Sequence, residues 1–187
     1  RITQLSAKDT QAGNWALEKP AAVRASAKEA SLETACLSSA PTRLCAQGQW
    51  NQSGDFSGRV QLSDLNPERF KRFLPQNTTL ATHINGDASA SGKIGGALQG
   101  KATLNLAPGS VGTLANGRPV KIAFNASTLQ LVTDSRAANL QARLDLAQTG
   151  QLRASLNAQD PFGAARLNGA LDASVTDLKI VSAFAPQ

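Results

Sequence analysis

The sequence is poor in the residues that usually fill a protein core or build an active site. Its 187 residues include no tyrosine, no methionine, one histidine and two cysteines, and aromatic residues make up 4%. No apolar run approaches the length of about 20 residues that a transmembrane helix requires. Few combinations of nucleophile and base are available, so the sequence predicts neither an enzyme nor a cofactor. Two cysteines and the distant His83 also fall short of the four ligands of a structural zinc site, so no metal site is expected.

The basic residues are not arranged as in a nucleic-acid-binding protein. The formal net charge is +6, but Lys and Arg are spread singly along the chain. Nucleic-acid-binding proteins usually gather them on one face and interleave aromatic residues for stacking. We therefore expect no nucleic-acid partner and interpret these charges as solvated outer faces of strands. The tightest basic group, Arg69, Lys71 and Arg72, leaves open a contact with an anionic head group.

The two cysteines indicate the compartment. Eight residues, including Pro41, separate Cys36 from Cys45 and read as a turn between two short apolar arms. We predict a disulfide that closes this loop, with two unpaired buried thiols as the alternative. A disulfide would place the protein in an oxidising compartment such as a periplasm.

Apolar and polar residues alternate along most of the chain from about residue 80 to residue 175. In one segment, Leu140, Ala142 and Leu144 alternate with Gln141 and Arg143. This period of two is typical of antiparallel strands with one wet face and one apolar face. Glycine, proline and asparagine recur every 10 to 20 residues, as the turns of an antiparallel meander require.

The apolar row is rich in small residues, which leaves room for another molecule to lie on it. Closed β-sandwiches usually fill the space between their sheets with large side chains. We therefore predict an apolar groove, and the alternative is that the same residues form an ordinary core beneath a second sheet. The predicted groove residues are Val60, Leu62, Ile84, Leu104, Leu106, Val120, Ile122, Phe124, Leu144, Leu146, Leu156, Leu167 and Leu171.

Two segments that follow alternating strands are similar to each other. Residues 62–76 read LSDLNPERFKRFLPQ and residues 173–187 read ASVTDLKIVSAFAPQ. In the first, Asn66 is a predicted N-cap and Pro67 occupies the first helical position. We expect approximate sub-repeats of a strand plus a short helix at 50–76 and 160–187, within one continuous β-rich segment over 1–187. The phenylalanines predicted to plug the sheet are Phe70, Phe73 and Phe184.

An ordered set of short motifs resembles the TamB family, which is related to the AsmA-like group. The set begins with Trp15-Ala16-Leu17 and continues through the Cys36-Leu37 pair, the Leu44-Cys45 pair and residues 48–50. The LSDLNPERFKRFLPQ segment, Ile84-Asn85-Gly86, the strand at 96–106 and Pro108-Gly109 follow in the same order. The resemblance covers most of the chain. Since the chain begins at Arg1 and starts and ends inside the alternating pattern, we expect a piece from the interior or C-terminal region of a longer protein.

The resemblance implies a fold and a setting. TamB-like proteins form an elongated, curved antiparallel sheet folded over on itself, called a β-taco, which is solenoid-like and has an apolar interior groove. They are anchored in the inner membrane of diderm bacteria and span the periplasm. The resemblance implies that the outer-membrane barrel TamA is a partner through regions outside this segment, and that membranes are contacted through ends that this segment lacks.

Three functions are compatible with these observations. The groove would shield phospholipid acyl chains during transport between the inner and outer membranes. Alternatively, it would hold the apolar faces of client β-strands, as a chaperone-like factor for assembly of outer-membrane β-barrels and for autotransporter secretion. A third possibility is a structural spacer whose groove is filled by its own loops and helices.

Overall fold

The computed structural model describes residues 1–10, 13–115, 117–161 and 163–176, which fold almost entirely into antiparallel β-strands. This confirms the predicted all-β class. The elements are β1 (Ser6–Asp9), β2 (Gly13–Leu17), β3 (Val23–Ala25), β4 (Glu29–Ser39), β5 (Thr42–Asn51), β6 (Asp55–Leu65), η1 (Pro67–Phe73), β7 (Thr79–Ala81), β8 (Ile84–Lys93), β9 (Leu98–Leu106), β10 (Gly109–Ala115), β11 (Arg118–Phe124), β12 (Ser127–Asp134), β13 (Ala137–Asp145), β14 (Gly150–Gln159) and β15 (Arg166–Val175).

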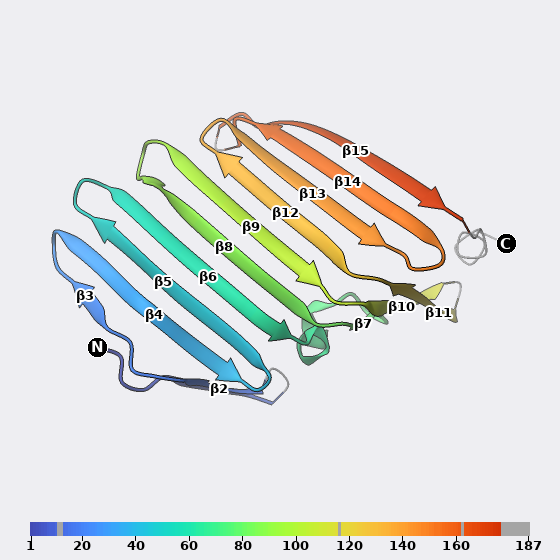
Figure 1. Cartoon of the computed structure of the whole chain (residues 1–187), viewed down its shortest axis with the longest axis horizontal. Coiled ribbons are helices and arrows are strands. Elements are labelled where there is room, and N and C mark those ends of the chain that lie inside the picture. The colour runs from blue at the N-terminus through green and yellow to red at the C-terminus, as the bar shows by residue number, and fades with distance from the viewer. Residues whose placement is uncertain (11–12, 116, 162, 177–187) are drawn as a thin grey trace.

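Twelve strands form one large open sheet (Figure 1). Its order is β1-β2-β4-β5-β6-β8-β9-β12-β13-β14-β15, and β3 also pairs with β4. Most neighbours in space are neighbours in sequence, because short turns join successive antiparallel strands. Within the described ranges β15 does not pair with β1, so the sheet is not closed into a barrel.

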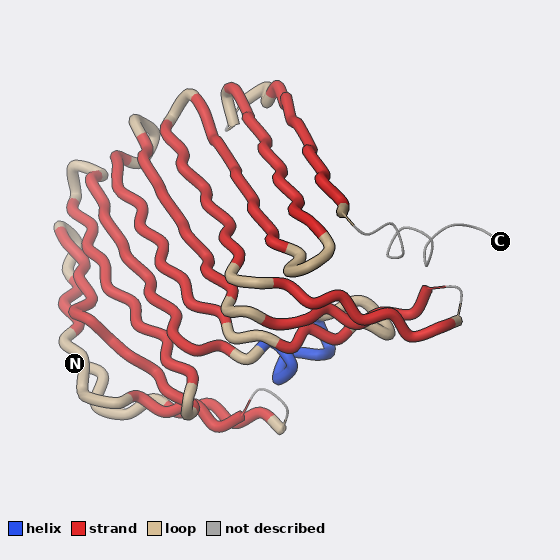
Figure 2. The backbone as a smooth tube through the Cα atoms, turned by 45° about the vertical axis from the view of Figure 1, so that its right-hand side comes forward, coloured by secondary structure: helices blue, strands red, loops and turns tan. Residues whose placement is uncertain are grey.

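A second, three-stranded sheet grows from one end of the large one. Its order is β11-β10-β7, and it is built from two connections: β7 precedes β8, and β10 and β11 lie between β9 and β12. Figure 2 shows this small sheet and η1 projecting together from the lower end of the strands of the large sheet. The two connections meet there because both leave the large sheet at the same end.

Several of the most buried side chains among the described residues lie at the corner between the two sheets. Phe124 is only 3% exposed, and a Cβ on Gly109 would lie 3.1 Å from its Cζ atom. The buried Thr82 hydroxyl donates to the Ala107 carbonyl at 2.7 Å, and the Ala107 N–H donates to the His83 carbonyl at 2.9 Å. These contacts hold the small sheet against the large one.

The helix η1 follows β6, which is the order of a strand plus a short helix predicted for residues 50–76. The Asn66 side chain accepts a hydrogen bond from the Glu68 N–H at 2.9 Å, which confirms the predicted N-cap. The Arg69 guanidinium donates to the carbonyls of Ser39 at 3.0 Å and Ala40 at 2.9 Å, so the helix is tied to the β4–β5 turn. The segment of the second sub-repeat where a helix was predicted lies beyond residue 176 and so falls outside the described residues.

Aspartates at two hairpin turns are held as carboxylates by local hydrogen bonds. The backbone N–H groups of Arg136 and Ala137 donate to Asp134 at 2.7 and 2.8 Å, and these bonds lower the pKa of its carboxyl. Hydrogen bonds from Ser53 and Asn51 likewise lower the pKa of Asp55. The Asp134 carboxylate thereby accepts hydrogen bonds from two backbone N–H groups that the turn would otherwise leave without a partner.

Cys36 and Cys45 form a disulfide across the β4–β5 hairpin. They are directly opposite in the register, and both are more than nine-tenths buried. The Arg43 guanidinium, which also pairs with Glu18 at 3.0 Å, donates to the Cys36 sulfur at 3.2 Å. The disulfide therefore fastens the end of the sheet where β2 joins β4.

We expect removal of this disulfide to lower stability. In the chain-entropy account, a bridge with a sequence separation of 9 contributes about 2 to 3 kcal/mol. The double variant Cys36→Ala/Cys45→Ala should lose about this much in urea unfolding at neutral pH. Intact mass after alkylation without reductant provides the control, and two alkylated thiols in that sample would contradict the bridge.

Candidate hydrophobic surface

The register of the large sheet aligns apolar side chains in rows that cross nine strands. Directly paired residues of an antiparallel sheet point to the same face, so each chain of partners defines one row. The central row consists of Leu37, Leu44, Leu62, Gly86, Leu104, Leu129, Ala142, Ala154 and Leu171. The second row consists of Ala35, Ala46, Val60, Ala88, Ala102, Leu131, Leu140, Leu156 and Gly169.

A third row on the same face is made mainly of small residues. It consists of Leu32, Gly48, Gly58, Ala90, Gly100, Thr133, Ala138, Ala158 and Leu167. Its one polar side chain, Thr133, donates its hydroxyl to the Ala137 carbonyl at 3.1 Å. We call the face that carries these three rows the apolar face. No charged residue stands in any of the rows.

The apolar face is extensive and uncovered. Strands about 4.8 Å apart make nine strands about 38 Å wide, and the three rows span about 14 Å along the strands. Leu104 and Leu156 are 37% and 40% exposed, and at β15 Leu167 and Leu171 reach 67% and 68%. Among the described residues the buried apolar side chains are Ala21, Cys36, Cys45, Ala115 and Phe124, so no second layer covers the face.

Leucines on this face lean over neighbouring glycines. A Cβ built on Gly86 would lie 2.5 Å from Cδ2 of Leu104, and one on Gly169 would lie 3.3 Å from Cδ1 of Leu156. A Cβ built on Gly48 or Gly58 would instead meet only backbone atoms of the adjacent strand in the same sheet. The glycines therefore give the leucines room to lie flat and leave shallow gaps elsewhere in the surface.

The structure brings most of the predicted groove residues together. Six of them lie in the rows: Val60, Leu62, Leu104, Leu156, Leu167 and Leu171. The register adds Ile84, Leu106 and Leu144 to the same face. Leu146 lies just beyond β13, where its N–H donates to the Gly150 carbonyl at 2.8 Å. Three of the predicted residues stand apart, because β11 belongs to the small sheet: Val120, Ile122 and Phe124.

Some residues of the apolar face were missing from the sequence prediction. Leu129 and Leu131 of β12 lie in the middle of the face, and Leu37 and Leu44 extend it to β4. The alternation of Leu129 and Leu131 with polar residues is a usable signal. It is weakened by Val132, which follows Leu131 directly and points to the other face, where it is 59% exposed.

The predicted plug residues lie at the end of the sheet. Phe70 and Phe73 of η1 have ring centroids 6.5 Å apart, and the Arg72 guanidinium lies 4.8 Å from the Phe73 centroid. Phe73 is 70% exposed. Phe184 falls outside the described residues.

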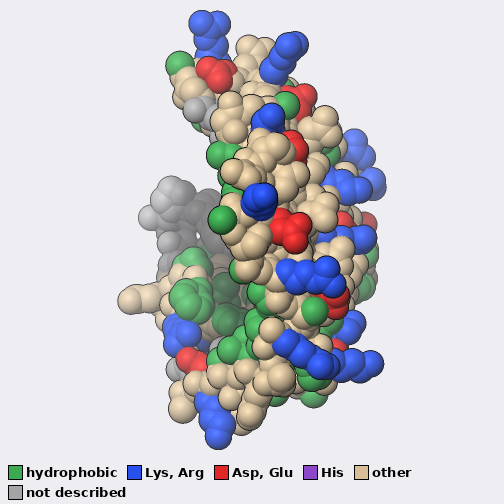
Figure 3. All heavy atoms as spheres, turned by 90° about the vertical axis from the view of Figure 1, so that its left-hand side faces the viewer, with side chains coloured by type: hydrophobic (Ala, Val, Ile, Leu, Met, Phe, Trp, Pro, Cys, Tyr) green, Lys and Arg blue, Asp and Glu red, His purple; other side chains and the backbone are tan. Residues whose placement is uncertain are grey.

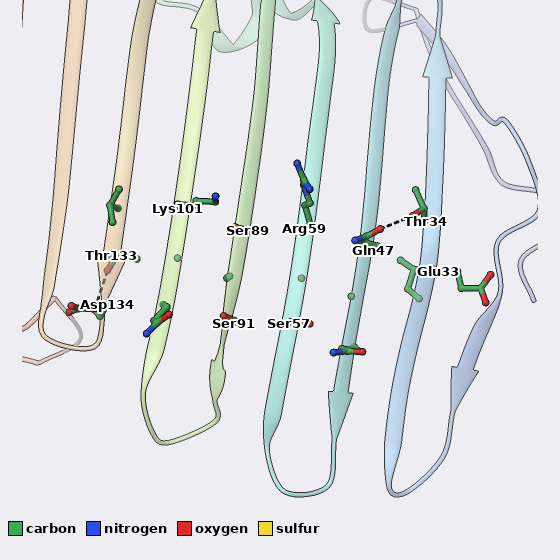
Figure 4. Close-up of a pocket in the computed structure, with 18 of the residues that line it drawn as sticks. Glu33, Thr34, Gln47, Ser57, Arg59, Ser89, Ser91, Lys101, Thr133 and Asp134 are labelled. Atoms are coloured by element: carbon green, nitrogen blue, oxygen red, sulfur yellow. Dashed lines mark hydrogen bonds between the residues drawn. The ribbon is translucent and has the colours of Figure 1, made fainter.

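The opposite face of the large sheet is polar and carries most of its charge. Figure 3 views the sheet from its β4 side and shows Lys and Arg gathered on one side, with the other side hollowed above a projecting lower arm. The polar face has its own hollow of about 1120 Å³ between β4 and β13. Gln47, Arg59, Ser89 and Lys101 form one row across it. Figure 4 shows these side chains, with the Thr34 hydroxyl donating to Gln47 at 2.6 Å.

The described residues hold neither a metal centre nor a membrane-spanning helix. They include no group of three or more His, Cys, Asp and Glu side chains that could bind a metal ion. None of their helices is long and apolar enough to cross a membrane.

An open single-layer sheet with one aliphatic face and one polar face defines a class of protein that presents an extended apolar surface. A family model described as "TamB, N-terminal domain" matches residues 2–187. The chain therefore belongs to the TamB family, as its sequence motifs predicted. The description places the match in an N-terminal domain, whereas the motifs had indicated an interior or C-terminal region. No curated protein and no solved structure matches the chain significantly.

The family has a defined cellular context. The TamB family belongs to a translocation and assembly module and is not known as a family of enzymes. Its members span the periplasm from an anchor in the inner membrane and are associated with TamA.

We expect a charge on the apolar face to be tolerated by the fold. Leu104→Asp places a carboxylate where water reaches it, so the variant should lose only the apolar burial of leucine, about 1 to 3 kcal/mol in urea unfolding. Asn105→Asp, the next residue of β9, is the matched control on the polar face and should change stability by less than about 0.5 kcal/mol. A loss above about 4 kcal/mol in Leu104→Asp would instead show that this leucine belongs to a closed core.

Proposed function

We propose that the apolar face shields the acyl chains of phospholipids as they pass between the inner and outer membranes. The observation that carries this proposal is the continuity of the three aliphatic rows from β4 to β15 without a charge. The rows run across the strands, in the direction in which the sheet grows. A hydrocarbon chain lying along them passes from one strand to the next without meeting a charged side chain.

The chemistry of the face favours passage over tight binding. Transfer of a CH₂ group from water to an apolar surface gains about 0.8 kcal/mol, so an acyl chain is held without any specific contact. Leucine, valine and alanine offer the chain nearly equivalent positions along the rows. A charged or hydrogen-bonding side chain among them would create a favoured stop, and the rows contain only Thr133, whose hydroxyl is already satisfied within the hairpin.

The proposal requires a groove, and it takes the small sheet and η1 as a side wall beside the apolar face. Both project together from one end of the strands of the large sheet (Figure 2). Val120 and Ile122 belong to the small sheet. The proposal thus divides the predicted groove residues between a floor on the large sheet and a side wall on the small one, except Phe124, which is buried in the corner between the two sheets.

A chaperone-like role in barrel assembly or autotransporter secretion uses the same surface for a different occupant. The apolar face of a client β-strand would then replace the acyl chain. The long edge of β15, which has a neighbour on one side only within the described residues, is the feature that favours this alternative. TamA would be reached through other parts of the full-length protein in either case.

Site-specific photo-crosslinking in living cells distinguishes the two occupants. A photoreactive amino acid is placed at position 104 or 144 of the full-length protein, and position 105 serves as the control that faces away. We expect phospholipid adducts at 104 and 144 and a signal at 105 reduced by about tenfold or more, because only the first two positions face the apolar rows.

The other outcomes are equally informative. Adducts to outer-membrane protein chains alone would replace the lipid proposal with the assembly role. Equal adducts at 104 and 105, or none at either, would contradict a lipid-bearing face and favour a structural spacer.

A further inference from the structure

Two arginines on the polar face are directly opposite each other, and neither forms an ion pair with an acidic side chain in the described part of the chain. Arg143 of β13 is the cross-strand neighbour of Arg153 of β14. Side chains in this relation have Cβ atoms about 4.5 to 5.5 Å apart, and like charges there destabilise the sheet. No carboxylate of the described residues forms an ion pair with either guanidinium, although Asp172 of β15 is the next residue along the row.

Most of the polar side chains around the two arginines offer hydrogen-bond donors, and Asp172 is the one carboxylate among the described residues that line the site. Thr128 is the register neighbour of Arg143 on β12. The adjacent row on the same face runs from Gln130 through Gln141 to Ser155. These residues and the two arginines, together with Asp172, Ala142 and Ala154, line a hollow of about 330 Å³ that is distinct from the larger one between β4 and β13.

We propose that this hollow is a binding site for a tetrahedral oxyanion, namely a phosphate group. Each guanidinium group is a planar fork that can donate two parallel hydrogen bonds to two oxygens of one phosphate group. The hydroxyls and amides of the neighbouring residues donate to the remaining oxygens. An anion between the forks also reduces the repulsion of the opposed charges.

The arrangement differs from the scattered cations elsewhere on this face. Arg59 and Lys101 stand in one row but are separated by Ser89 on the intervening strand, so their Cα atoms are about 10 Å apart. The Arg59 guanidinium and the Lys101 ammonium are not directly opposite each other, so they do not form an opposed pair of forks. Arg59 is therefore a matched control: it is an exposed arginine on the same face that lacks an opposed partner.

The phosphate group comes either from a free anion in solution or from a lipid head group. The site lies on the face opposite the aliphatic rows, so it does not depend on the proposed acyl-chain function. Failure of either proposal leaves the other standing, because crosslinking reports on positions 104 and 144 and phosphate binding on positions 143 and 153.

The first test is an NMR titration of the 187-residue chain with inorganic phosphate, at constant ionic strength maintained with chloride. We expect saturable shifts of the Arg143 and Arg153 side-chain Nε–H signals. Arg143→Gln or Arg153→Gln should weaken the affinity by about tenfold or more, because each removes a charged fork. Arg143→Lys should also weaken it, since a point charge replaces the fork, and Arg59→Gln should bind as the unchanged chain does.

Asp172 provides a test of position. Asp172→Asn removes a negative charge beside Arg153, so it should tighten phosphate binding. An affinity that does not rise would place the anion away from Arg153 and overturn the proposal. Linear, unsaturated shifts over all the cations of the face, or unchanged affinity in Arg143→Gln, would overturn it as well.

Vesicle flotation separates the two sources of phosphate. Vesicles containing phosphatidic acid are compared with vesicles of phosphatidylcholine alone, using the unchanged chain and Arg143→Gln/Arg153→Gln. Flotation with phosphatidic acid that is lost in the double variant identifies a head-group site. Phosphate binding without such flotation identifies a site for the free anion. Absence of both would overturn the proposal.

Discussion

The backbone hydrogen-bond ladder of the large sheet carries this structure, because there is almost no core to do so. In most domains a sheet buries one face against another layer. Here the aliphatic rows stay half exposed, and the well-buried residues cluster at the corner near Phe124 and at the Cys36–Cys45 hairpin. The central strands are 8 to 11 residues long, and each has antiparallel partners on both sides. Stability is therefore distributed along the ladder, as in repeat proteins where each unit contacts mainly its neighbours.

A sheet without a covering layer needs devices that fix its register and its ends. Hairpin turns closed by Asp55 and Asp134 set the pairing of the strands they join. The disulfide and the Arg43–Glu18 ion pair fasten the β2–β4–β5 end. A slip of one residue anywhere would move leucines to the polar face. Continuity of the apolar rows over nine strands therefore requires that each turn has the correct length.

The alternation in sequence predicted the strands and their two faces well, because a half-buried strand leaves a direct record in the pattern. The division into two sheets could not be read in the same way. Val120 and Ile122 alternate with polar residues just as Leu140 and Leu144 do, and nothing local distinguishes a strand of the small sheet from one of the large sheet. The difference depends on β7, a strand of three residues that pairs with β10 across a separation of about 30 residues. Similarly, Val132 interrupts the alternation of apolar and polar residues in β12, so the sequence prediction missed Leu129 and Leu131.

The two faces of the sheet divide the chemistry of the molecule. Because successive residues point to opposite faces, every aliphatic position on β13 and β14 has a polar neighbour that points away from it. Leu144 and Arg143 are adjacent in sequence, yet one faces the aliphatic rows and the other the proposed phosphate site. A phospholipid has the same division into apolar chain and phosphate head. The sheet offers surfaces for both parts but on opposite sides, so a single lipid could not occupy the two at once. The aliphatic rows and the arginine pair therefore place two separate constraints on the sequence of the same strands. Alternate residues of each strand satisfy the first constraint, and the residues between them satisfy the second.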